Sequence, residues 1–176
     1  MIDEKKFINE ILKDAAKKMV LAARTAPKGR GIDTFTFCLA EDDDIKKISK
    51  KMKEIGEESG AQAFLRDSQS ILSSPVIVLL GTAIKAVGLK RCSRCGFKDC
   101  DEKEKHKNIP CAFNTGDLGI AIGSAVSVAA DNRVDCRVMH TVGAAALELG
   151  LLGKDVKIAF GVPLSATSKN PFFDRK

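Results

Sequence analysis

Four of the six cysteines fall within twenty residues, with the spacing Cys92-x2-Cys95-x4-Cys100-x10-Cys111. Thiolates are soft ligands, and four of them in one loop suit a zinc ion or an iron–sulfur cluster. Gly96 directly follows the second cysteine, and a glycine there lets the backbone turn tightly around a metal. The segment therefore predicts a metal-binding loop.

The cysteine spacing alone leaves the identity of the metal open. Closely spaced cysteines favour structural zinc, but the last two ligands are too far apart to form a second short Cys-x2-Cys pair. An iron–sulfur cluster needs the same four ligands, although Pro110 precedes Cys111, whereas bacterial ferredoxins carry a proline after their last cysteine. Unligated thiols are the third alternative.

The length of 176 residues and the hydrophobic content of 44% predict one domain, residues 1–176, with a substantial core. No apolar stretch reaches about eighteen residues, so we expect no membrane-spanning helix. The polar start of the chain argues against a signal peptide. We therefore expect a cytoplasmic protein with reduced thiols, in which residues 90–112 form the cysteine-rich loop.

The net charge of +6 is concentrated around the cysteines, because the segment from Lys85 to Lys107 holds eight Lys/Arg and four Asp/Glu. Cations near a four-thiolate cluster stabilise it and raise its reduction potential. A solvated basic loop is the plainer alternative. Since the chain has no Trp and no Tyr to stack on bases, we do not expect nucleic-acid binding.

Hydrophobic periodicity predicts helices and strands in an α/β pattern. The first helix has apolar residues at i, i+3, i+4 spacing with lysines opposite, and the strand at 75–80 is apolar throughout, as in a buried strand. The expected helices are residues 3–24, 41–55, 64–72, 115–130 (capped by Asn114 or Thr115) and 138–149, and the expected strands are 34–39, 75–80 and 156–160. The cysteine loop is an insertion after the strand at 75–80.

We expect no metal-binding or catalytic role for the other two cysteines and the two histidines, with ligation by His106 as the alternative. Cys38 lies on the strand face opposite Phe35 and Phe37 and is expected to be a thiol of the hydrophobic core and not a ligand. Cys136 follows a turn and is structural, with a redox role as the alternative. His106 is expected to be solvated inside the loop, and His140 to pack on a helix.

Three glycines, Gly116, Gly119 and Gly123, share one side of the helix expected at 115–130. A glycine in a helix costs about 1 kcal/mol relative to alanine, so a close neighbour should offset this cost. We expect that neighbour to be the helix containing Gly143 or the same helix of a second subunit. The alternative is a cofactor ring lying against bare backbone.

With these elements in place, the chain resembles the nitroreductase-like flavoproteins. The segment Ala26-Pro27-Lys28-Gly29 occupies the place of the loop after that family's first helix, and Ser74-Pro75-Val76-Ile77-Val78 resembles its Ala-Pro-Val-Val-Ile strand. Val156 to Pro163 resembles its strand ending in Gly-x-Pro. More specifically, the four-cysteine loop combined with Asp117 to Val126 and Asn170 to Arg175 resembles the prokaryotic "ferredoxin domain-containing" proteins.

The resemblance implies an α+β fold with a central mixed sheet flanked by helices, and a homodimer. For the loop it favours an iron–sulfur cluster of the [4Fe–4S] type over zinc. It also introduces FMN as a second cofactor, whose phosphate needs convergent cationic donors. The candidates to bind it in this chain are Arg24, Lys28, Gly29 and Arg30 in the first loop, and Lys169 and Arg175 in the tail. The first loop departs from the family, because Lys28 stands where the flavoproteins have Ser. The Arg-Ser-x-Arg segment, which precedes the first helix in the flavoproteins and binds the FMN phosphate, has no counterpart here.

Two classes of function follow from these features. In the first, the chain is an iron–sulfur redox or electron-transfer protein, with or without a flavin, that acts on a redox partner protein or a small-molecule substrate. In the second, the cysteines hold structural zinc in a non-enzymatic binding or scaffold protein. No Ser/His/Asp set, paired carboxylates or phosphate-binding glycine loop indicates hydrolysis or phosphoryl transfer. We favour the first class, and oxygen sensitivity separates the two.

Overall fold

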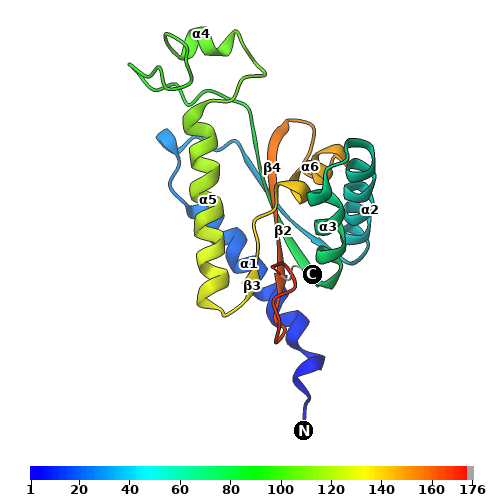
Figure 1. Cartoon of the computed structure of the whole chain (residues 1–176). Helices are drawn as coiled ribbons and strands as arrows, with labels where there is room; N and C mark the ends of the chain where they lie inside the picture. The colour runs from blue at the N-terminus through cyan, green and yellow to red at the C-terminus, as the bar shows by residue number, and fades with distance from the viewer. Residues whose placement is uncertain (174–176) are drawn as a thin grey trace.

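The amphipathic first helix and the alternating strand after it begin a three-layered α+β fold (Figure 1). The computed structural model describes residues 1–173. A short 3-10 turn, η1 (Glu4–Lys6), precedes α1 (Ile8–Thr25), and a second turn, η2 (Gly29–Gly31), leads into β1 (Phe35–Glu41). The remaining helices cover the two faces of the sheet that β1 starts.

The sheet has the strand order β1-β2-β4-β3, where β2 is Val76–Ala83, β3 is Asp135–Cys136 and β4 is Val156–Ser165. All of these pairings are antiparallel, so the expected mixed sheet was wrong for the described strands. Two helices connect β1 to β2, namely α2 (Asp42–Ser59) and α3 (Gln62–Ser70), followed by the turn η3 (Ile71–Ser73). The first helix leads away from the end of β1 and the second leads back to it, so β2 starts beside the end of β1 and runs antiparallel to it. A single helix there would instead favour a parallel strand.

Two hydrophobic cores lie on opposite faces of the sheet. Helices α1 and α5 (Ala112–Asp131) cover one face, while α2, α3 and α6 (His140–Glu148) cover the other (Figure 1). Strand β2 contributes to both cores: Val78 and Leu80 point into the first, and Ile77 and Leu79 into the second. This burial of both faces confirms the prediction made from its uninterrupted apolar sequence.

The start of α5 differs from the expectation. The helix begins at Ala112 with Cys111 at its N-cap position, three residues earlier than predicted from its apolar run. Asn114 does not cap the helix, because its side-chain amide donates to the hydroxyls of Thr34 and Thr82 at 2.8 and 3.0 Å. This buried polar network ties the first turn of α5 to β1 and β2.

The segment between β2 and α5 projects from the body at the N-terminal end of α5 (Figure 1). It contains the short helix α4 (Cys100–Glu104) but contributes no residue to either core. The N-terminus extends from the opposite end of the molecule. Among the described residues, no helix is both long enough and apolar enough to cross a membrane.

Candidate metal centre and the adjoining pocket

The cysteine loop turns tightly at Gly96, as its sequence predicts. Gly96 has φ +85°, a left-handed conformation that glycine adopts without strain, and its N–H donates to the carbonyl of Ser93 at 3.1 Å. Helix α4 begins four residues later, and the Asp99 carboxylate caps it by accepting from the N–H of Glu102 at 2.8 Å. Cys95 therefore lies within the turn that closes at Gly96, and Cys100 is the first residue of α4.

Side chains of α4 bind the loop to itself and to the segment that follows β2. Glu104 Oε1 accepts from the N–H of Ala86, and Glu102 Oε2 accepts from the N–H of Lys98, both at 2.7 Å. The rings of Phe97 and His106 stack with their centroids 4.8 Å apart. His106 is exposed, as expected, but it also helps to order the loop.

All six cysteines are free thiols. Cys111 is buried where α5 begins, while Cys92, Cys95 and Cys100 are half-buried; the Cys100 thiol lies 3.8 Å from the carbonyl oxygen of Leu89. No three His, Cys, Asp or Glu side chains of residues 1–173 lie close enough together to hold a metal ion. The structure thus gathers the four predicted ligands in one loop without bringing their sulfurs to one point.

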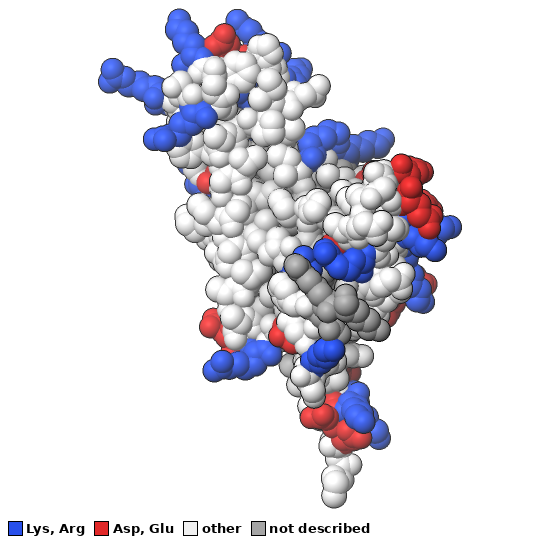
Figure 2. Space-filling model, in the orientation of Figure 1, with Lys and Arg blue, Asp and Glu red and all other residues white. Residues whose placement is uncertain are grey.

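The chemistry of the loop fits an anionic metal site. Four thiols supply a complete set of soft ligands. The Lys103 ammonium is buried within the same loop and has no hydrogen-bond partner, so a nearby anion would satisfy it. Lys and Arg side chains also gather on the surface at this end of the molecule (Figure 2). The residues present therefore suit a thiolate-bound cluster or zinc ion.

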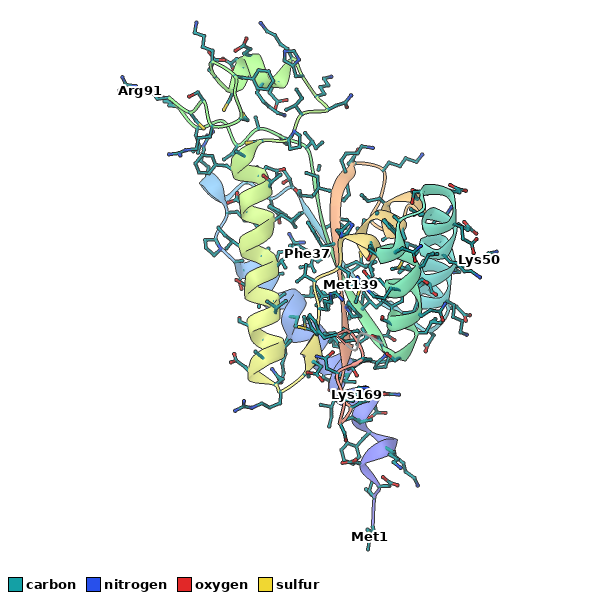
Figure 3. All side chains as sticks on the ribbon, in the orientation of Figure 1. Met1, Phe37, Lys50, Arg91, Met139 and Lys169 are labelled. Carbon is teal, nitrogen blue, oxygen red and sulfur yellow. The ribbon has the colours of Figure 1, made fainter. Side chains whose placement is uncertain are left out.

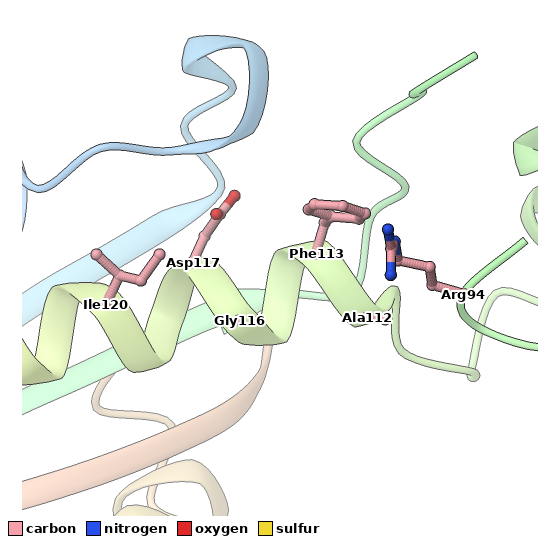
Figure 4. Close-up of a pocket in the computed structure, with 6 residues that line it drawn as sticks. All are labelled: Arg94, Ala112, Phe113, Gly116, Asp117 and Ile120. Atoms are coloured by element: carbon pink, nitrogen blue, oxygen red, sulfur yellow. The ribbon is translucent and has the colours of Figure 1, made fainter. Parts of the chain in front are cut away.

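A pocket of about 450 Å³ adjoins the loop at the first turns of α5. Arg94 lies across from the Phe113 ring, with its guanidinium carbon 5.7 Å from the ring centroid, and Asp117 lies further along the helix (Figure 4). The pocket is lined by Arg94, Ala112, Phe113, Gly116, Asp117 and Ile120. A volume of this size accommodates a small organic molecule.

The cations predicted to hold an FMN phosphate have partners within the protein. Arg24 pairs with Asp33, and its guanidinium lies over the Phe37 ring. Lys28 Nζ donates to the carbonyls of Ala23, Arg24 and Ala26 at 2.8–3.1 Å, and burial lowers the pKa of this amine. This arrangement neutralises the C-terminal end of α1 and leaves neither side chain free for an anion.

The other predicted flavin ligands do not complete such a site. The N–H of Gly29 donates to Asp117 Oδ2 at 2.8 Å, and Arg30 donates to the carbonyls of Val87 and Gly88 at 3.2 and 2.9 Å. Lys169 lies toward the N-terminal end of the molecule, away from the loop marked by Arg91 (Figure 3). Arg175 lies outside the described residues. Within one subunit, Arg24, Lys28, Gly29 and Arg30 are thus engaged in internal bonds and do not form an open phosphate site.

Cys38 and Cys136 lie in strands away from the cysteine loop. Cys38 packs against the core opposite the one that holds Phe35, as expected from the alternation of β1. Burial raises the pKa of the Cys38 thiol; burial, followed by the nearby Asp135 carboxylate, raises that of Cys136. Both thiols are therefore weak ligands and weak nucleophiles in the folded protein.

The glycine side of α5 does not pack against α6, so the first of the two expected neighbours was wrong; a helix of a second subunit is left as the other. A Cβ added at Gly116, Gly119 or Gly123 would meet nothing within 4 Å, whereas one at Gly143 would lie 1.9 Å from the carbonyl oxygen of Ala159. Helix α6 uses its glycine to approach β4 on the other face of the sheet. The glycine side of α5 is open in the single subunit.

Sequence reasoning missed Lys103 and the pairing of Arg94 with Phe113. A lysine in a charged loop is normally expected to be exposed to solvent, and the residues next to Lys103 in the sequence do not indicate that it is buried. In the sequence, Arg94 lies between Cys92 and Cys95, and Phe113 follows Cys111 by two residues. Their positions beside predicted ligands did not indicate that the two side chains would contact each other. Asp117 was noted for the family resemblance, but its bond to Gly29 depends on tertiary structure.

Residues 107–175 match the family described as "Uncharacterized protein containing a ferredoxin domain (DUF2148)". An "Uncharacterized protein" of Archaeoglobus fulgidus is 43% identical over 183 residues, which cover 99% of this chain and 97% of the relative. The chain belongs to this family of ferredoxin-domain proteins. The matched segment includes Cys111 and begins after the other three loop cysteines, so it does not by itself define the ligands.

Solved structures with a similar fold are flavoproteins and nitroreductases. A BluB-like flavoprotein from Clostridium difficile 630 superposes with a TM-score of 0.56 at 19% identity, covering 89% of this chain and 84% of that one. The nitroreductase CinD from Lactococcus lactis, in complex with nicotinic acid, gives 0.58 at 14% identity, covering 96% and 81%. The FMN- and NADPH-dependent nitroreductase NfnB from Sphigopyxis sp. strain HMH gives 0.60 at 11%, covering 93% and 83%. The fold is nitroreductase-like, and identities this low establish the fold alone.

Proposed function

We propose that this chain is an iron–sulfur redox protein whose cluster, of the [4Fe–4S] type, is held by Cys92, Cys95, Cys100 and Cys111. The observation that carries the proposal is the placement of these four free thiols in one loop, residues 90–112, beside a pocket of about 450 Å³. The family description, with its ferredoxin domain, supports iron–sulfur over zinc. A cluster of this kind supplies single-electron transfer.

The chain's own residues would set the properties of that site. Cys111 is anchored by α5, while the other three ligands lie on a loop held by the Glu104–Ala86 and Glu102–Lys98 bonds. The basic surface of the loop favours an anionic cluster and disfavours its dissociation. Free cysteines also suit a reducing compartment such as the cytoplasm.

The pocket is the proposed meeting place of the redox site and its electron partner or substrate. Arg94 lies between two of the proposed ligands, and Phe113 follows Cys111 by two residues, so the pocket wall and the ligands share the same short segments. A small planar anion would stack on Phe113 and pair with Arg94. A protein partner would cover the same wall.

The flavin suggested by the resemblance has less support. The NfnB neighbour is described as FMN-dependent, but Arg24, Lys28, Gly29 and Arg30 are all engaged in internal bonds here. We therefore assign no step to FMN. The second class of function, a scaffold with structural zinc, remains the alternative because zinc accepts the same four thiolates.

The open side of α5 supports a homodimer. The exposed Gly119 and Gly123 would let a second helix approach closely, and the adjacent Ile120 is 47% exposed. Light scattering on the purified protein should give twice the chain mass of 18.9 kDa. Gly123→Glu should give a monomer, whereas Lys50→Glu on the solvent side of α2 should leave the dimer intact. A monomeric wild type would remove this part of the proposal.

The deciding experiment is the absorption spectrum of protein purified without oxygen, with iron, sulfide and zinc measured on the same sample. We expect a broad band near 400 nm that bleaches with dithionite, together with iron and sulfide in equal amounts. A structured band near 450 nm would add a flavin. A colourless protein with one zinc per chain would overturn the redox function.

Serine variants identify the ligands in the same measurement. Replacing Cys92, Cys95, Cys100 or Cys111 one at a time should lower the iron content and the visible absorption, because serine is a poor ligand for iron. Cys136→Ser is the matched control, since this thiol lies on β3 outside the loop, and it should keep the full iron content. Equal iron in all five variants would refute the ligand assignment.

A further inference from the structure

Lys103 is a buried cation without a hydrogen-bond acceptor. Its side chain is 1% exposed, and its Nζ makes no hydrogen bond. Glu104 Oε1 lies 3.5 Å away, a distance that permits ion pairing, but the contact lacks hydrogen-bond geometry. That oxygen already accepts the N–H of Ala86, and the Glu104 side chain is half-exposed to water. Glu104 therefore compensates the Lys103 charge incompletely.

This burial sets Lys103 apart from its neighbours. The other seven Lys and Arg residues between positions 85 and 107 are all exposed. Among the described residues, the other buried side-chain polar atoms without a partner are the neutral Ser74 Oγ and Asn114 Oδ1. An ammonium group is the most costly of the three to bury unpaired, so its position calls for a nearby negative charge.

The helix geometry places Lys103 next to a proposed ligand. Cys100 is the first residue of α4, and Lys103 follows it by three positions. Residues i and i+3 lie on the same helix face, and long side chains point back toward the helix N-terminus. Lys103 and Cys100 therefore share one face of α4, and the ammonium is buried there beside Glu104 Oε1, which ties α4 to Ala86.

We infer that Lys103 is the internal counter-charge of the four-cysteine site, an inference that rests on the function proposed above. Its ammonium stabilises the gathered thiolates, and it stabilises the reduced cluster more than the oxidised one. Reduction adds one electron, and so one negative charge, to an already anionic site, and no bond forms or breaks. A fixed cation beside the site thus raises the reduction potential and slows the loss of iron. Lys103 is a positioning and tuning residue and not a ligand.

The test compares five proteins reconstituted without oxygen from ferrous iron and sulfide: wild type, Lys103→Met, Lys103→Gln, Lys103→Arg and Lys105→Met. Lys105 is exposed two residues away and controls for the loss of one positive charge from the loop. The readouts are the midpoint potential from a dithionite titration, the rate of iron loss to a chelator, and thermal unfolding of the metal-free protein. Lys103→Gln serves if the Met variant does not fold.

Both neutral variants of Lys103 should shift the ratio of reduced to oxidised cluster at least tenfold toward the oxidised form, equivalent to about 59 mV for one electron. They should also lose iron about tenfold faster, while their metal-free forms are at least as stable as wild type. Lys103→Arg and Lys105→Met should stay within about threefold of wild type. A purely structural lysine would change the stability of the metal-free protein and leave the potential unchanged.

The two possible failures are distinct. If wild type carries a cluster and both neutral variants keep its potential and its iron-loss rate, the role of Lys103 is overturned and the redox function stands. If wild type holds zinc and no iron or sulfide, the proposed function and this inference both fail. Equal shifts in Lys103→Met and Lys105→Met would also overturn the inference, because loop charge in general would then explain them.

Discussion

Asp117 accepts a hydrogen bond from the backbone N–H of Gly29 at 2.8 Å, although the two residues are 88 positions apart in the sequence. The bond joins η2 to the second turn of α5, and the Asp117 side chain is almost fully buried. A Cβ on Gly29 would lie 2.9 Å from Val87 Cγ1 and 3.3 Å from Asp117 Oδ2, so any larger residue would require these side chains to shift. The wall of the pocket is therefore held in place by the turn that follows α1.

Removal of this carboxylate should loosen that connection. Asp117→Ala leaves the Gly29 N–H without its acceptor, and hydrogen bonds to charged groups contribute about 2 kcal/mol. Asp117→Asn keeps an acceptor oxygen and should cost less than Asp117→Ala. Urea unfolding would measure both, with Asp131→Ala at the exposed end of α5 as the control, expected within about 0.5 kcal/mol of wild type. Equal stabilities of Asp117→Ala and the control would contradict this role.

Two glycine-to-alanine substitutions in helices should have opposite effects. Gly143→Ala places a methyl group 1.9 Å from the carbonyl oxygen of Ala159, and backbone cannot yield as a side chain does, so we expect a loss of about 3 kcal/mol or more. Gly123→Ala meets no neighbour and gains helix propensity, up to about 1 kcal/mol. Urea unfolding at low protein concentration tests both. A destabilised Gly123→Ala monomer would show that this side of α5 is not open.

Stability should fall in acid partly because of Asp33. Burial raises the pKa of its carboxyl, but the N–H of Phe35 and the Arg24 guanidinium outweigh burial and hold the pKa below the ordinary 3.8. The unfolded chain therefore takes up this proton at a higher pH than the folded protein. The stabilisation is present above pH 3.8 and is lost as the pH falls through the lower, folded-state pKa.

Asp33→Asn isolates this contribution from the other carboxylates. The urea midpoint should fall more steeply between about pH 5 and about pH 3 for wild type than for Asp33→Asn, because the variant lacks the carboxyl of residue 33 that takes up a proton in this range. Parallel curves for the two proteins would show that Asp33 titrates alike in the folded and unfolded chains.

Cys38 and Cys136 should resist alkylation in the folded protein. Burial raises the pKa of both thiols, and the thiolate is the reactive form. With iodoacetamide at about pH 8, both should react on the order of tenfold more slowly than in the urea-unfolded chain. Mass spectrometry of the derived peptides gives each rate separately. Equal rates in the folded and unfolded chains would mean that these thiols are accessible.

Long periodic elements were predictable from the sequence, and short ones were not. The i, i+3, i+4 stripe of α1 identified a helix that buries one face, and the short, continuous apolar run of β2 identified a strand that is buried on both faces. Helix α4 and strand β3 were missed, since five and two residues are too few to show a period. The antiparallel pairing of β1 and β2 was not predicted, because it follows from the way α2 and α3 pack against each other. Expected helices and strands, taken one at a time, do not show such packing.

The candidate site was predictable in its residues and not in its arrangement. Four cysteines in one loop could be found by spacing alone, and the turn at Gly96 confirms what that spacing suggested about the backbone. The partners of Lys28 and Arg30, by contrast, are backbone carbonyls, and any carbonyl in the chain is an equal candidate until the fold is known. The burial of Lys103 could not be predicted either, because it also depends on how the loop folds.

The cysteine loop contributes to neither of the two cores that flank the sheet, and this separation determines how far oxidative damage to the loop would affect the rest of the protein. Oxidation of Cys92, Cys95 or Cys100 would be local damage, because no residue of 84–110 belongs to either hydrophobic core. The body would outlast repeated damage to the loop. Restoring the proposed cluster would then require reductant, iron and sulfide, and not the refolding of the chain.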